Sequence, residues 1–94
     1  MGYYSLRLCA GGGAFEAVPS PRLSLDLQDV RRTLEAHQVG VVDARVMLIV
    51  RLEKELTLSR DGRVLIKTKD AAQAASIFER LRGWLGLPST EASR

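Results

Sequence analysis

The sequence predicts a small α+β domain of two layers, in which two helices lie on one face of a mostly antiparallel sheet. Several short stretches alternate between apolar and polar residues, which is typical of half-buried strands. Two longer stretches repeat their apolar residues at helical spacing. The triplet Arg-Asp-Gly at 60–62 stands between two alternating stretches and is a strong hairpin signal. The expected order is strand, helix, three strands and helix, in one domain over residues 1–94.

Length and composition limit the class of protein further. With 94 residues, of which 46% are hydrophobic and 27% charged, the chain has material for one modest core. Its single cysteine, Cys9, excludes a disulfide scaffold and favours a reducing, cytoplasmic location. No apolar run approaches the ~20 residues of a membrane span, and residues 1–4 lack the basic start of a signal peptide. We therefore expect no membrane association.

The N-terminal part is expected to contribute one strand to the sheet. Residues 3–10 alternate, with Tyr4, Leu6 and Leu8 on the apolar side, and three glycines end the stretch. The following segment, residues 11–24, contains two prolines and is predicted to form a long loop.

A first helix is predicted over residues 26–38. Its apolar stripe consists of Leu27, Val30, Leu34 and His37. Ser24 or Asp26 can cap the first turn, because a short polar side chain can accept hydrogen bonds from the first free backbone N–H groups. Gly40 provides a stop signal beyond the last periodic residue.

Three strands are predicted next, over residues 43–52, 54–59 and 63–68. The hairpin loop that joins the last two strands requires a positive φ, which Gly62 can adopt without strain. The side chains expected to face the helices are Val46, Leu48, Val50, Leu56, Leu58, Val64 and Ile66.

A second helix is predicted over residues 70–84, with Asp70 as its cap. Its apolar stripe consists of Ala71, Ala74, Ala75, Phe78, Leu81 and Leu85. The small alanine side chains would let this helix lie close to the sheet. The remaining residues, 86–94, include a proline and several small polar residues, and are predicted to form a flexible tail.

The residue types that support catalysis or metal binding are sparse. The glycines at 11–13 are not followed by the Lys and Ser or Thr of a phosphate-binding loop. His37 is the only histidine, whereas a metal site needs several converging ligands. Cys9 has no base partner in the sequence that would make it a nucleophile. We therefore expect a protein that is not an enzyme and has no cofactor.

The face of the sheet that points away from the helices is the most informative surface. Its pleat is expected to display an apolar centre with basic residues around it, and Glu55 as its only acid. The predicted binding surface consists of Tyr3, Arg7, Arg45, Met47, Ile49, Arg51, Arg63, Leu65 and Lys67. An uncovered patch of this kind suggests a protein or nucleic-acid interface. Alternatively, residues 11–24 or a second copy of the chain cover it, and we expect a homodimer through sheet faces or edges.

One segment also resembles a known family. Residues 55–67, with the hairpin triplet at 60–62, are followed by Asp70 and an alanine-rich helix. This pattern resembles the C-terminal segment of ThiF/MoeB/HesA-type adenylyltransferases, which activate ubiquitin-like sulfur carriers. The nucleotide-binding domain of those enzymes, with its catalytic residues, zinc cysteines and ATP loop, has no counterpart here. The resemblance implies a free-standing accessory domain that docks on a sulfur carrier or on its activating enzyme.

A second resemblance leads to a different partner. The strand–turn–strand–helix pattern is also similar to one half of the TATA-binding-protein fold, whose open sheet face sits on DNA. The net charge of +3 permits a nucleic acid or an acidic protein as partner. However, the apolar wedges that kink DNA are often Phe, and only Tyr3, Met47, Ile49 and Leu65 are available here. The sequence therefore favours a protein-interaction domain, with a nucleic-acid-binding module as the alternative.

Overall fold

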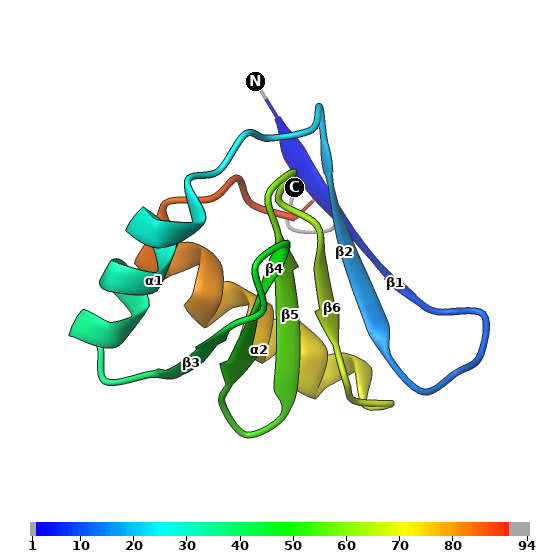
Figure 1. Cartoon of the computed structure of the whole chain (residues 1–94). Helices are drawn as coiled ribbons and strands as arrows, with labels where there is room; N and C mark the ends of the chain where they lie inside the picture. The colour runs from blue at the N-terminus through cyan, green and yellow to red at the C-terminus, as the bar shows by residue number, and fades with distance from the viewer. Residues whose placement is uncertain (1, 91–94) are drawn as a thin grey trace.

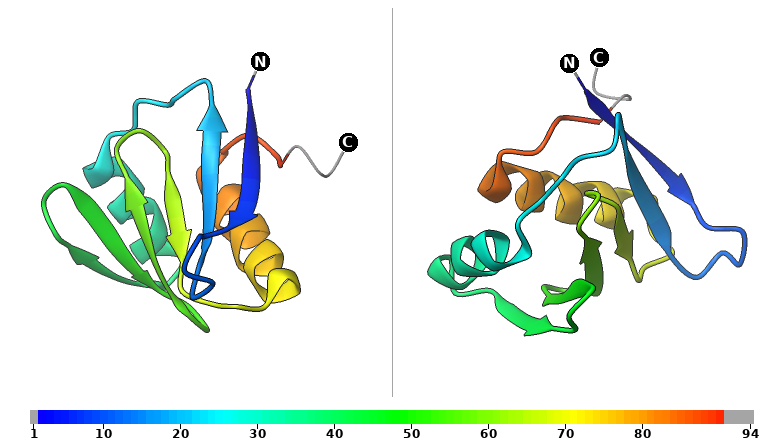
Figure 2. Two further views of the ribbon diagram at one scale, coloured as in Figure 1. Left: turned by 90° about the vertical axis from the view of Figure 1, so that its right-hand side faces the viewer. Right: turned by 45° about the horizontal axis from the view of Figure 1, so that its top comes forward.

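The structure, a computed structural model, describes residues 2–90 and confirms the α+β class. One antiparallel sheet of six strands, in the order β1-β2-β6-β5-β4-β3, has both helices on one of its faces (Figures 1 and 2). The elements are β1 (Tyr3–Leu8), β2 (Phe15–Ser20), α1 (Leu27–Ala36), β3 (Gly40–Asp43), β4 (Met47–Arg51), β5 (Glu55–Ser59), β6 (Val64–Ile66) and α2 (Ala71–Leu85). Neither helix is long and apolar enough to cross a membrane.

The predicted loop over residues 11–24 is wrong at its centre, because β2 lies there between β1 and β6. Phe15 and Ala17 point into the core, as a strand with period two requires. Pro19 concealed this pattern, since a proline argues against a central strand. It is tolerated because the pairing of β2 with β6 ends at Ala17, so the missing N–H of Pro19 removes no hydrogen bond of the sheet.

The strand predicted over residues 43–52 is shorter than expected, because β4 covers only Met47–Arg51. A further strand, β3, was not predicted: it covers Gly40–Asp43, meets the predicted range only at Asp43, and is joined to β4 by a tight turn. Arg45 adopts a positive φ of 72° in this turn, a conformation that the sequence did not signal with Gly or Asn. The turn removes Val46 from the sheet, and its side chain is 67% exposed instead of facing the helices. Gly40 begins β3 and does not end the helix, whose C-cap is His37.

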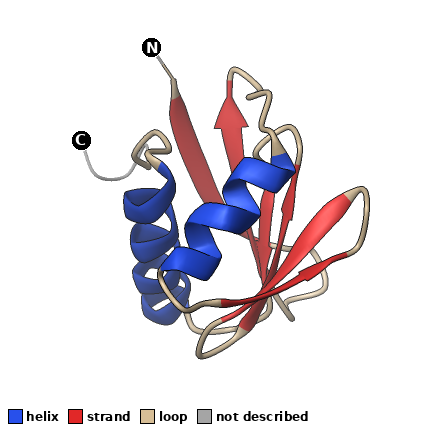
Figure 3. Ribbon diagram, turned by 60° about the vertical axis from the view of Figure 1, so that its left-hand side comes forward, coloured by secondary structure: helices blue, strands red, loops and turns tan. Residues whose placement is uncertain are grey.

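Both helices form where the sequence predicts them, and both pack on the same face of the sheet (Figure 3). The carboxylate of Asp26 caps α1 by accepting hydrogen bonds from the N–H groups of the first turn, and Asp70 does the same for α2. The predicted stripe of α2 is wrong at two positions, because Ala71 and Ala75 are exposed. Ile77 is buried in their place.

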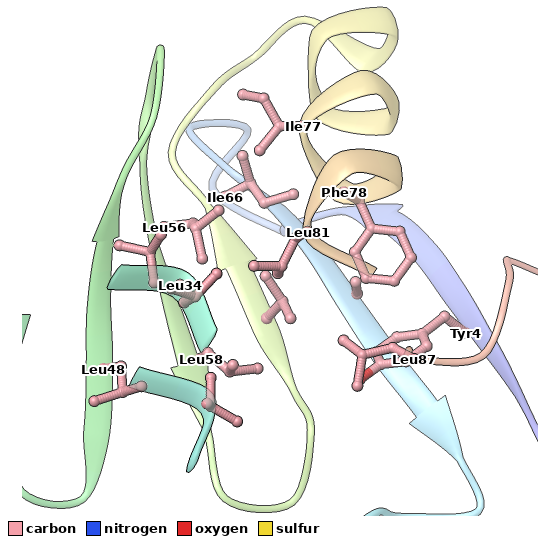
Figure 4. Packing of buried hydrophobic residues seen from close by; sticks show 14 of the residues in the cluster. Tyr4, Leu34, Leu48, Leu56, Leu58, Ile66, Ile77, Phe78, Leu81 and Leu87 are labelled. Carbon is pink, nitrogen blue, oxygen red and sulfur yellow. The ribbon is translucent and has the colours of Figure 1, made fainter. Parts of the chain in front are cut away.

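The core lies between the helices and the inner face of the sheet (Figure 4). Six inward side chains of the central strands have no exposed surface: Leu48, Val50, Leu56, Leu58, Val64 and Ile66. Tyr4 of β1 packs against Phe78 of α2, with ring centroids 4.7 Å apart, and its hydroxyl donates a 2.6 Å hydrogen bond to the carbonyl oxygen of Gly62. The positive φ predicted for Gly62 is confirmed at 91°. A Cβ atom at Gly62 would lie 2.9 Å from the Tyr4 oxygen and 2.9 Å from Leu23 Cδ1.

The predicted flexible tail is wrong for residues 87–90. Gly86 ends α2 in the left-handed conformation and turns the chain back, so that Leu87 is buried against the core. The backbone N–H of Tyr4 then donates a 2.8 Å hydrogen bond to the carbonyl oxygen of Ser89, and Thr90 forms a parallel bridge with Tyr4. The rest of the predicted tail, residues 91–94, lies outside the described residues.

Candidate interface on the open sheet face

The register of the strands determines which side chains share the face opposite the helices, here called the open sheet face. One row runs across all six strands, because each of its residues is paired with the next. This row consists of Arg7, Glu16, Leu65, Thr57, Ile49 and Val42. A second row includes Met47 and its partner Ser59. The predicted residues Arg7, Met47, Ile49 and Leu65 are therefore brought together on one surface.

The centre of the open sheet face is apolar. Met47, Ile49 and Leu65 are half-buried by their neighbours, and Val42 at the edge of the sheet is 45% exposed. A hollow of about 180 Å³ lies over this centre, lined by Met47, Thr57, Ser59, Arg63 and Leu65. Its lining combines the apolar side chains of Met47 and Leu65 with two hydroxyl groups and one guanidinium group. Such a hollow can receive one apolar side chain and hydrogen-bond the groups next to it.

Basic and acidic side chains are paired on this face. Glu16 of β2, whose side chain is only 12% exposed, forms ion pairs with Arg63 and with Arg7, the latter at 3.3 Å. Lys67 Nζ lies 3.0 Å from a carboxylate oxygen of Glu55. The prediction that Glu55 is the only acid of this face is therefore wrong. Glu16 was missed because its strand was predicted to be a loop.

A second, more polar hollow of about 300 Å³ adjoins the first one. Its lining consists of Arg7, Glu16, Val18, Pro19, Arg22, Asp61 and Arg63. Arg63 lines both hollows and so connects the apolar centre to this charged region. With three guanidinium groups and two carboxylates, the lining has one positive charge in excess and can pair with an acidic group. The alternation of residues 15–19 is the signal by which sequence reasoning could have found this part of the site.

Three predicted residues lie at the margin of this surface or away from it. Tyr3 is half-buried at the start of β1, and Arg51 is exposed at the end of β4, opposite Glu55. Arg45 does not lie in a strand. Its turn brings it to a hollow beside the start of α1, where it lies with Leu27 and Gln28. The backbone N–H of Arg45 and the side-chain amide of Gln28 both donate to Asp43, and these hydrogen bonds lower the pKa of that carboxyl group.

The chemistry of the remaining candidates is limited. Among residues 2–90, no group of three or more His, Cys, Asp or Glu side chains is arranged to hold a metal ion. His37 stacks on Trp84, with ring centroids 5.3 Å apart. Cys9 is a half-buried free thiol.

No protein-family model, curated protein or solved structure matches this chain. Two features of the open sheet face bear on function: the hollow over its apolar centre, and the ion-paired arginines Arg7 and Arg63 beside it.

Proposed function

We propose that this chain is a non-catalytic domain that binds a folded protein through its open sheet face. The observation that supports this most is the hollow of about 180 Å³ over Met47 and Leu65, next to the charged region around Arg63. An apolar centre with a polar surround is the usual anatomy of a protein–protein interface. The partner would insert an apolar side chain into the hollow. It would also bring an acidic group towards Arg22, which lines the charged hollow beside the paired Arg63 and Glu16.

The resemblance of residues 55–67 to the C-terminal segment of sulfur-carrier-activating enzymes suggests which partners to test first. They are a ubiquitin-like sulfur carrier and its activating adenylyltransferase. In this proposal the domain docks on one of these proteins and supplies no catalytic residue. Its own contribution is a preformed surface, since strands hold their side chains in place at little further entropic cost on binding.

A nucleic acid is the alternative partner, and the ion pairs of the open sheet face argue against it. Arg7 and Arg63 both contact Glu16, and Lys67 contacts Glu55. A phosphate group would have to compete with these carboxylates for each cation. Aromatic side chains that stack on bases are also scarce, with only 5% of all residues aromatic. A protein with apolar and acidic groups suits this surface better than a polyanion.

A titration of duplex and single-stranded oligonucleotides at two salt concentrations separates these two classes of partner. Nucleic-acid binding through phosphates falls steeply with salt, because each neutralised phosphate releases a counterion. We expect only weak binding that is lost near physiological salt. Sub-micromolar binding at physiological salt would reject the protein-binding proposal in favour of the nucleic-acid alternative.

Variants of the open sheet face test the protein-binding proposal itself, by calorimetric titration with the sulfur carrier and with the activating enzyme of the same genome. Met47→Ala or Ile49→Ala should weaken binding more than Arg51→Ala, because apolar burial at an interface centre contributes more than an exposed charge. Arg32→Ala on α1 is the control for loss of charge, and Leu8→Ala on the helix side of β1 is the control for loss of apolar surface. Equal losses in all variants, or no binding of either protein, would contradict the proposal.

A further inference from the structure

The outer edge of β1 has unused hydrogen-bonding groups. β1 is the outermost strand at one edge of the sheet. Cys9, just after β1, donates its backbone N–H to the carbonyl oxygen of Ala14, just before β2. Because successive residues of a strand point their backbone groups in opposite directions, those of Tyr4, Leu6 and Leu8 point away from β2. Tyr4 uses its N–H to bind Ser89. Within residues 2–90, the outward groups of Leu6 and Leu8 have no hydrogen-bond partner.

An apolar groove runs beside this edge on the helix side of the sheet. Its volume is about 420 Å³, and it is lined by Leu6, Phe15, Ala71, Ala75, Glu79, Arg82 and Thr90. The groove exists because two alanines of α2 face β1 and β2 with side chains too small to fill the space. Glu79 and Arg82 neutralise each other as an ion pair at 3.1 Å. Leu8, two residues after Leu6 and on the same face of β1, has a side chain that is 52% exposed.

We propose that this edge and groove bind an extended peptide segment of a partner, which adds to the sheet as a further strand. The outward backbone groups of Leu6 and Leu8 are two residues apart along the strand. Only an extended backbone offers hydrogen-bond donors and acceptors at the same spacing. The chain already places an extended segment at the first position of this edge, where Ser89 and Thr90 pair with Tyr4. The peptide would have apolar side chains at alternate positions, because every second side chain of the added strand faces the groove.

The opposite edge of the sheet does not offer the same site. β3 has only four residues and ends at the left-handed turn of Arg45. The side chain of Asp43 is engaged by Gln28 and lies 3.7 Å from Arg31. Short edge strands flanked by charged side chains resist the addition of a further strand. The asymmetry of the two edges therefore assigns peptide binding to β1. This inference concerns a surface distinct from the open sheet face and does not depend on it.

The test uses the whole chain and a phage-displayed library of random linear peptides. We expect enriched peptides to alternate apolar and polar residues. In amide hydrogen exchange followed by NMR, such a peptide should slow the exchange of the Leu6 and Leu8 amides by about tenfold or more. The amide of Arg7, which points towards β2, is the internal control and should be unchanged.

Two matched variants connect the peptide to the groove. Ala75→Glu places a charge in the groove and should weaken peptide binding by about tenfold or more. Ala72→Glu makes the same change at an exposed position of α2 outside the groove lining, and should leave binding unchanged. Because both positions are exposed, both variants should fold.

Three results would overturn this inference. The first is that no peptide is enriched. The second is that enriched peptides leave the Leu6 and Leu8 amides unprotected, or act on the open sheet face. The third is that the chain alone is a dimer in which these two amides are already protected, which would assign the edge to a second copy.

Discussion

The two faces of the central strands β4, β5 and β6 contrast sharply, although they belong to the same short stretches of chain. The inward residues, among them Leu58 and Val64, have no exposed surface. On the other face of these strands, Ile49 and Leu65 are half-buried and belong to the open sheet face. Because side chains alternate between the faces, one face can stabilise the fold while the other remains available for recognition.

The contrast predicts its largest effect in a pair of leucine substitutions. Leu58→Ala on the inner face should lower the free energy of unfolding by about 3 kcal/mol, because it leaves a cavity in the core. Leu65→Ala on the open sheet face should cost about 1 kcal/mol or less, since solvent can fill the space. Denaturant unfolding of both variants measures the difference. Similar losses in the two variants would show that the open sheet face is also part of the packed core.

The next effect concerns a turn that packs against the core. Gly62→Ala combines the strain of a positive φ with contacts at 2.9 Å to Tyr4 and Leu23. We expect a loss of about 2–3 kcal/mol. Gly86 also has a positive φ but nothing within 4 Å of an added Cβ, so Gly86→Ala should cost only the strain, about 1–2 kcal/mol. Thermal unfolding of the two variants should rank them in this order, and the reverse order would contradict the close packing at Gly62.

A smaller effect, dependent on pH, belongs to the only hydroxyl group in the core cluster described here. Tyr4→Phe should cost about 1–2 kcal/mol at neutral pH, because it leaves the carbonyl of Gly62 without its donor.

Burial raises the pKa of Tyr4 above that of the unfolded chain, and the nearby charge of Asp61 raises it further. Above a pH of about 10 the unfolded chain therefore binds fewer protons than the folded one, and stability falls as the pH rises. Unfolding between neutral and alkaline pH should show this fall in the wild-type chain and less of it in Tyr4→Phe, so equal slopes would contradict the buried hydroxyl.

The smallest effect is self-association through the open sheet face. In the absence of a partner, we expect two copies to pair at high concentration, because Met47, Ile49 and Leu65 form a continuous apolar centre. Sedimentation should show a dimer that dissociates on dilution, and Ile49→Lys should shift it towards the monomer. A clean monomer at high concentration would reject the dimer and leave the face free for another partner.

Local signals in the sequence were sufficient for much of the fold. Asp70 caps α2 as predicted, Asp26 is the one of the two predicted candidates that caps α1, and Gly62 forms the predicted hairpin. Each of these effects depends on neighbouring residues alone. The elements that were missed depend on tertiary context. The strand with Pro19 is stable only because its partner strand stops short of that residue. Arg45 accepts a left-handed conformation that its own residue type disfavours.

The same limits applied to the candidate interface. Its apolar centre followed from alternation in β4 and β6, so Met47, Ile49 and Leu65 were predicted correctly as neighbours. Its charged part required β2, and Glu16 was therefore missed. That omission changes the electrostatic character of the surface, because Arg7 and Arg63 are partners of a carboxylate and not free cations.

The central claim, that the open sheet face recognises a protein, is tested most directly by methyl NMR of the whole chain. Labelled methyl groups of Met47, Ile49 and Leu65 report on the open face, and those of Leu58 and Val64 report on the core. On titration with the sulfur carrier or its activating enzyme at physiological salt, we predict saturable shifts of the first set and an unchanged second set. Signals of the open face that stay in place with both proteins, but move with a duplex oligonucleotide, would contradict the claim.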